Sequence, residues 1–157
     1  MLNPFTRRTF QHLQLEILHH HDFLLTVAVQ VVDLERRVVG EQPVALAPAT
    51  LAARAVPAVG FVNCARTSAA EPVLLAWRDA GLELGNHGAM HLNLDTVDPE
   101  AWIADARACH DMLASTLGAP DRFFRYPYGH QGASEARKAA AAAALQDMGY
   151  RTAHFTI

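Results

Sequence analysis

Two histidines spaced four residues apart, His87 and His91, carry the strongest chemical signal in the sequence. They follow an expected short strand, Leu82–Gly85, so they occupy a loop at the carboxyl end of a strand, where α/β sheets collect functional groups. Imidazoles at positions i and i+4 lie on one side of a helical turn and can converge on one divalent metal ion. The spacing alone also fits two polar loop residues, because a zinc site needs a third protein ligand.

A second segment whose residues could take part in a reaction runs from Phe123 to His130 and reads FFRYPYGH. It also lies at the end of an expected strand, and Arg125 leads into a Pro-Tyr-Gly turn. Such a turn can aim a backbone N–H at a developing oxyanion, while an arginine can hold a carboxylate. On its own, the segment is more simply an ordinary strand-ending turn with aromatic packing.

Taken together and in this order, the two segments resemble the second and third motifs of the polysaccharide deacetylase family, the NodB-homology carbohydrate esterases. Residues Val56–Asn63 are similar to the second strand of that family. Residues Ala80–His87 are similar to its Gly-x-Glu-Leu-Gly-Asn-His entry to the metal motif. The resemblance covers residues 56–157.

The resemblance implies roles for individual residues. His87 and His91 match metal-binding histidines, with zinc or another divalent metal as the ion. Arg125 matches the arginine that orients the catalytic aspartate, and Tyr128 matches the residue whose backbone N–H helps to form the oxyanion hole. Gly88 departs from the family's usual Ser or Thr, whose hydroxyl braces the loop by hydrogen bonding.

The activity implied by the resemblance is metal-dependent removal of N- or O-acetyl groups from an acetylated carbohydrate. The metal would polarise the acetyl carbonyl and lower the pKa of its water toward about 7, and an aspartate would take the proton. However, the Asp-Asp pair of the family's first motif is absent from the sequence, and Asp33 is the one substitute, for at most one of the two roles. The later motifs are expected to be missing after Ile157.

These departures leave an alternative open: a non-catalytic, truncated or frame-disrupted deacetylase remnant with at most weak metal or sugar binding. They also predict little or no deacetylase turnover. Six further histidines are open to other interpretations. His19–His21 reads as a solvated polar run, His110 and His154 as packing or surface residues, and His130 as the one extra histidine that could face the site.

The amino-acid composition excludes several classes of protein. The 157 residues are 51% hydrophobic and 18% charged with a net charge of −3, which fits neither a disordered chain nor a basic nucleic-acid binder. No apolar run approaches the roughly 18–20 residues that a membrane span needs, and no export signal is visible. Cys64 and Cys109 are too few for a disulfide framework and say little about the redox compartment.

Short apolar runs that alternate with helical segments after about Val56 predict an α/β fold, an incomplete (β/α) barrel of the polysaccharide deacetylase type. One helix is predicted from the N-cap Asp98 to Gly118. The other expected elements are strands at Ala58–Val62, Leu82–Gly85, Phe123–Tyr126 and Thr152–Thr156 and helices at Glu71–Ala80 and from Ser134 to Gly149.

The N-terminal part of the chain gives a weaker pattern. Phe23–Val32 predicts one buried strand that ends at Asp33. Met1–Asp22 shows no clear period, and Leu34–Pro48 mixes charges with glycine and proline. We therefore divide the chain into residues 1–45, a poorly assigned segment with one strand, and residues 46–157, a partial deacetylase-like domain.

Overall fold

A six-stranded sheet forms the centre of the molecule in a computed structural model, which describes residues 15–20, 23–31, 46–66, 71–118 and 122–154. The strands follow each other in the sheet in chain order. Strands β2 to β6 pair in parallel, and β1 pairs antiparallel with β2. The strands are β1 (Leu15–His20), β2 (Phe23–Val31), β3 (Ala58–Val62), β4 (Glu83–Asn86), β5 (Phe123–Phe124) and β6 (Arg151–Thr152).

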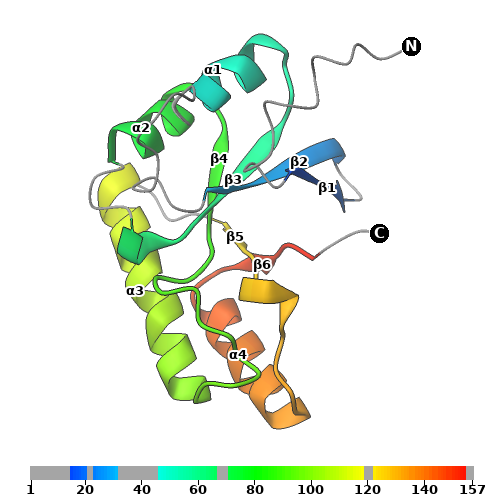
Figure 1. Cartoon of the computed structure of the whole chain (residues 1–157), viewed down its shortest axis with the longest axis vertical. Helices are drawn as coiled ribbons and strands as arrows, with labels where there is room; N and C mark the ends of the chain where they lie inside the picture. Colours follow the sequence, from blue (N-terminus) through cyan, green and yellow to red (C-terminus); the bar gives the residue numbers. More distant parts are fainter. Residues whose placement is uncertain (1–14, 21–22, 32–45, 67–70, 119–121, 155–157) are drawn as a thin grey trace, which may run out of the picture.

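Each connection between two parallel strands contains an α-helix, and Figure 1 shows these helices along one side of the sheet. The α-helices are α1 (Leu46–Ala53), α2 (Glu71–Asp79), α3 (Pro99–Leu117) and α4 (Glu135–Asp147), and two short 3₁₀ helices are η3 (Cys64–Arg66) and η4 (Pro127–Gly129). The repeated strand–helix unit confirms the α/β fold class and the incomplete (β/α) barrel.

The helix-capping signals in the sequence act as predicted. The Asp98 carboxylate accepts a hydrogen bond from the Glu100 N–H at 2.8 Å, and α3 ends at Gly118 with φ 74°. The Ser134 hydroxyl accepts from the Arg137 N–H at 3.3 Å at the start of α4. These contacts satisfy backbone groups that the first helical turn leaves without partners.

Two elements were not anticipated from the sequence. β1 lies in a stretch without apolar periodicity and is defined by its backbone pairing with β2, which the sequence pattern does not report. α1 contains Pro48 in its first turn, where a missing N–H costs no helical hydrogen bond. Pro48 therefore begins a helix rather than interrupting one. The division at residues 45 and 46 stays a prediction, and β2 pairs with β3 across it.

Both faces of β3 are buried, which explains its continuous apolar sequence. Ala58 and Val62 pack in a cluster with Trp77 of α2 and Leu113 of α3. Phe61 lies on the other face, in a cluster with Val59 and with partly buried Phe123 of β5 and Ala153, which follows β6. Packing on both faces of the sheet thus fixes the position of β3.

A disulfide joins Cys64 of η3 to Cys109 of α3, with their Cα atoms 5.2 Å apart. The sequence analysis assigned this pair no role, because the two cysteines are separated by 45 positions and only the fold brings them together. The bond fastens the end of β3 to the long helix. Within the described part of the chain, no helix combines the length and apolar character needed to cross a membrane.

Candidate active site

The carboxyl ends of β3, β4 and β5 lie at one edge of the sheet. Their register pairs Val62 with Asn86 and Asn86 with Phe124. The next residues continue this alignment, because the His87 N–H donates to the Val62 carbonyl and the Arg125 N–H donates to the Asn86 carbonyl, each at 3.0 Å. The structure therefore brings the two sequence segments that carry His87 and Arg125 side by side.

His87 is held in one orientation and one tautomer. Its side chain is buried, and Nδ1–H donates to the Arg125 carbonyl at 2.8 Å. Nε2 then carries the lone pair. Burial lowers the pKa of His87 to about 4, against an upward effect of the Arg125 carbonyl, and His91 adds to the lowering. The imidazole is neutral at neutral pH, which is the form that binds metal ions.

His91 completes a pair of facing nitrogens. Its Nε2 lies 3.1 Å from His87 Nε2, and in this contact the His91 N–H donates to the His87 lone pair. The backbone of His91 is left-handed, with φ 59°, and its ring centroid lies 4.5 Å from that of Tyr128. The positive φ turns the second imidazole back toward the first.

The spacing of the two imidazoles fits a metal ion. Nitrogens about 2.0–2.1 Å from a tetrahedral zinc ion lie about 3.3 Å apart, close to the 3.1 Å between the two Nε2 atoms. The anchored Nδ1–H of His87 is also the usual arrangement of a ligating histidine. Among residues 15–154 that the structure describes, no group of three His, Cys, Asp or Glu side chains could hold a metal. The pair could supply two ligands, while a zinc site needs at least three.

Asn86 supports the loop that follows β4. Its side chain is completely buried, and Oδ1 accepts from the Gly88 N–H at 2.8 Å. Nδ2 donates to the Ala106 carbonyl of α3 and to the Tyr150 hydroxyl, each at 2.8 Å. The Tyr150 hydroxyl also lies 2.9 Å from His110 Nδ1. Asn86 was part of the sequence motif, but its role depends on partners from α3 and the chain before β6.

Asp105 of α3 contacts the same loop and was missed by the sequence analysis. Its carboxylate accepts from the Met90 N–H at 2.8 Å and also from the Ala89 N–H. Burial raises the pKa of Asp105, and these hydrogen bonds and the nearby His91 oppose the rise. Since α3 lies well beyond the motif in sequence, no local signal pointed to this residue.

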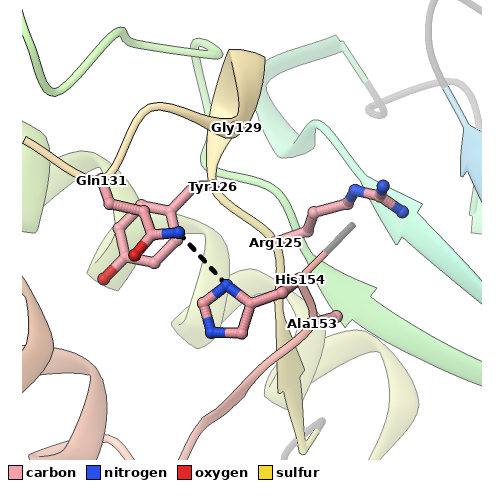
Figure 2. A pocket seen from close by; sticks show the side chains of 6 residues that line it. All are labelled: Arg125, Tyr126, Gly129, Gln131, Ala153 and His154. Atoms are coloured by element: carbon pink, nitrogen blue, oxygen red, sulfur yellow. Dashed lines mark hydrogen bonds between the residues drawn. The ribbon is translucent and has the colours of Figure 1, made fainter. Parts of the chain in front are cut away.

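Arg125 is a buried cation whose backbone carbonyl accepts the hydrogen bond from His87. Its guanidinium carbon lies 5.6 Å from the ring centroid of Phe61. Burial lowers the pKa of Arg125 to about 10, so the side chain stays charged at neutral pH. It also lines a pocket, shown in Figure 2, in which Gln131 Nε2 lies 3.2 Å from His154 Nδ1. Figure 2 shows the guanidinium pointing away from this Gln131–His154 pair.

Tyr128 lies in the turn η4, and His130 follows it directly. Tyr128 has φ 59° and ψ 3°, and its side chain is 61% exposed next to His91. His130 Nδ1 lies 3.1 Å from Asp95 Oδ2 and 3.0 Å from Asn93 Oδ1. His130 therefore pairs with the loop before α3 rather than with the two facing imidazoles.

The remaining histidines and the candidate carboxylate lie elsewhere in the chain. His110 contacts Tyr150 from α3, and His154 is exposed after β6. His19 and His20 belong to β1. His21 and Asp33 lie outside the described residues, so the structure does not test a role for Asp33 at the site.

Comparison with known proteins identifies relatives of this fold. The family model for polysaccharide deacetylase matches residues 41–153. No curated protein sequence matches the chain significantly. Similar solved structures include a CE4 family pseudoenzyme from Bacillus anthracis, with 17% identity and a TM-score of 0.65 over 81% of this chain and 41% of that one.

Two further structures have the same fold. The peptidoglycan deacetylase PdaC from Bacillus subtilis has 20% identity and a TM-score of 0.59 over 80% of this chain and 62% of that one. A family 4 carbohydrate esterase from Streptomyces lividans, in complex with acetate, has 18% identity and a TM-score of 0.58 over 67% of this chain and 52% of that one. The chain thus spans less than two thirds of the length of each of these three structures.

Proposed function

Because this chain belongs to the polysaccharide deacetylase family, we propose that it forms the metal-binding part of a hydrolase that removes N- or O-acetyl groups from a carbohydrate. One observation carries the proposal: His87 and His91 face each other through Nε2 atoms 3.1 Å apart, and the first imidazole is anchored by its Nδ1–H. Two neutral imidazoles in this arrangement are a donor set for zinc or another divalent ion.

The chain's own residues would divide the work of acetyl hydrolysis. His87 and His91 hold the ion, which when bound polarises an acetyl carbonyl and lowers the pKa of water. Arg125, buried and positive, orients a carboxylate beside the histidine pair. The backbone N–H of Tyr128 donates to the oxyanion that develops on the acetyl group. Asp33 is the sequence candidate for the third ligand or the base.

A second function, metal or sugar binding without catalysis, is favoured by one specific feature. The sequence contains no adjacent aspartate pair, and the substitute Asp33 can fill at most one of the two roles that this pair has in the family. Loss of a positioned general base or acid lowers the rate by about 10²–10⁴. The Bacillus anthracis protein that shares the fold is itself described as a pseudoenzyme. We expect weak zinc binding and little turnover.

Zinc titration by calorimetry tests the metal site. Binding should be weak in the wild type and lost in His87→Ala and His91→Ala. The matched control is His130→Ala, an exposed histidine of the neighbouring turn that pairs with Asp95, and this variant should keep binding. Zinc binding that survives His91→Ala would contradict the proposed site.

Acetate release separates the two functions. Acetylated chito-oligosaccharide and acetylxylan are incubated with the protein, with and without added zinc. Zinc-dependent release that is lost in His87→Ala would establish catalysis, and loss in Asp33→Asn would assign the missing carboxylate. Zinc binding without release would support the non-catalytic function.

A further inference from the structure

The loop between His87 and His91 is held by the end of β3 and by the helix α3. Cys64 N–H and Ala65 N–H donate to the carbonyls of Gly88 and Ala89 at 3.2 and 3.0 Å, which ties this loop to the end of β3. The disulfide then ties the end of β3 to Cys109 of α3. Asp105 lies four positions before Cys109, on the same face of the helix. The helix is therefore locked in a register that directs Asp105 at the loop.

The Asp105 carboxylate accepts hydrogen bonds from the loop just before a residue with an unusual backbone conformation. His91 has φ 59°, which is uncommon for a residue other than glycine and requires support from its surroundings. The two residues before it donate to the Asp105 carboxylate: Met90 N–H at 2.8 Å, and Ala89 N–H. A carboxylate acceptor makes stronger hydrogen bonds to backbone N–H groups than a neutral one.

Gly88 leaves the space that this carboxylate fills. A Cβ atom built on Gly88 would lie 2.6 Å from Asp105 Oδ2, well inside van der Waals contact. Gly88 also has φ 77°. A side chain at position 88 and a carboxylate at position 105 thus exclude each other in this conformation. The bracing group of the loop comes from the helix rather than from the loop itself.

We propose that Asp105 is a positioning residue of the metal site, which holds the backbone of Ala89 and Met90 so that His91 faces His87. The expected effect on metal affinity rests on the proposed function. The hydrogen bonds of Asp105 to the loop do not, because they are present in the protein without metal. Replacing a partner that orients a metal ligand typically lowers metal affinity by about 10–100-fold. We expect a loss in this range for Asp105→Asn, which keeps the size of the side chain but removes the negative charge and replaces one of the two acceptor oxygens with an NH₂ group.

The experiment compares Asp105→Asn with Asp111→Asn, an exposed aspartate of the same helix, so that both variants lose one negative charge. Two readouts are measured: zinc affinity by calorimetry, and, in the metal-free protein, amide exchange of Met90 and the imidazole ¹⁵N shifts of His91 by NMR. Asp105→Asn should weaken zinc binding, speed exchange and move the His91 shifts. Asp111→Asn should change none of them.

A double-mutant comparison of stability tests whether the Asp105 side chain clashes with a side chain at position 88. Gly88→Ala should be more destabilising in the wild type than in Asp105→Ala, because the backbone strain is the same in both but the clash is present only with Asp105. If the wild type binds no zinc, the proposed function fails, while the metal-free NMR readouts still decide the role of Asp105. Unchanged Met90 exchange and His91 shifts in Asp105→Asn would overturn the proposal.

Discussion

Removal of the Cys64–Cys109 bond should cause a large loss of stability. The bond closes a loop with a sequence separation of 45. In the chain-entropy description, a loop of 15 residues is worth about 3 kcal/mol and one of 100 residues about 4.7 kcal/mol, which puts this bond at about 4 kcal/mol. A typical domain is stable by only about 5–15 kcal/mol. The bond therefore accounts for a large part of the expected total.

Urea denaturation of the oxidised and reduced wild type measures this loss. With an m-value of about 2 kcal/mol/M, a loss of about 4 kcal/mol lowers the urea midpoint by about 2 M. The variant Cys64→Ala/Cys109→Ala should unfold near the reduced wild type in both conditions. Mass spectrometry after alkylation shows whether the bond is present in the oxidised sample.

Two results would refute the reasoning. Equal midpoints for the oxidised and reduced wild type, with the bond verified, would show that closing this loop adds no stability. A double variant that matches the oxidised protein would lead to the same conclusion. The α3 register that supports the histidine loop would then depend on packing alone.

Three further predictions concern the site and its support. As the pH falls from 6.5 toward 4, His87 becomes protonated in the unfolded chain but stays neutral in the folded protein. The free energy of unfolding should therefore fall by roughly 3 kcal/mol over this range. In His87→Gln, the urea midpoint should depend less on pH over the same range. Gly85→Ala would put a Cβ 2.7 Å from Phe61 Cε1 and 2.9 Å from the Phe123 carbonyl, and should cost about 1–3 kcal/mol; an unchanged urea midpoint would contradict it. Tyr150→Phe removes the hydroxyl that accepts from Asn86 Nδ2 and should cost about 1–2 kcal/mol by urea denaturation, with faster exchange of the Gly88 amide.

The parts of the fold that could be predicted from the sequence are those with local signals. α3 begins at the cap Asp98 and ends at Gly118 because both residues act within one helical turn. β3 was found with its bounds, since an apolar run between turns is a local feature. β5 ends two residues before the predicted Tyr126, because strand pairing with β4 stops at Phe124. Residues 155–156 of the last predicted strand lie outside the described residues.

The candidate site divides in the same way. His87, His91 and Arg125 were identified because each stands in a short motif at the end of a strand. Asp105 and the Cys64–Cys109 bond were not, since their partners are brought near by the packing of α3 against the sheet. The predicted site residues were therefore recognisable from a local pattern, whereas the residues that contact their loop could be found only from the three-dimensional structure.

The order of the strands also has a consequence for how the protein is made. Every strand from β2 to β6 pairs with the strand that precedes it in the chain, so a nascent chain can add each strand to an exposed edge as it leaves the ribosome. None of the strands that the structure describes has to be inserted between two that have already paired. Tyr150, which holds Asn86, is nevertheless translated long after the histidine loop. The sheet can thus grow during synthesis, while the loop that follows β4 acquires the support of Tyr150 only after α3 and α4 have been made.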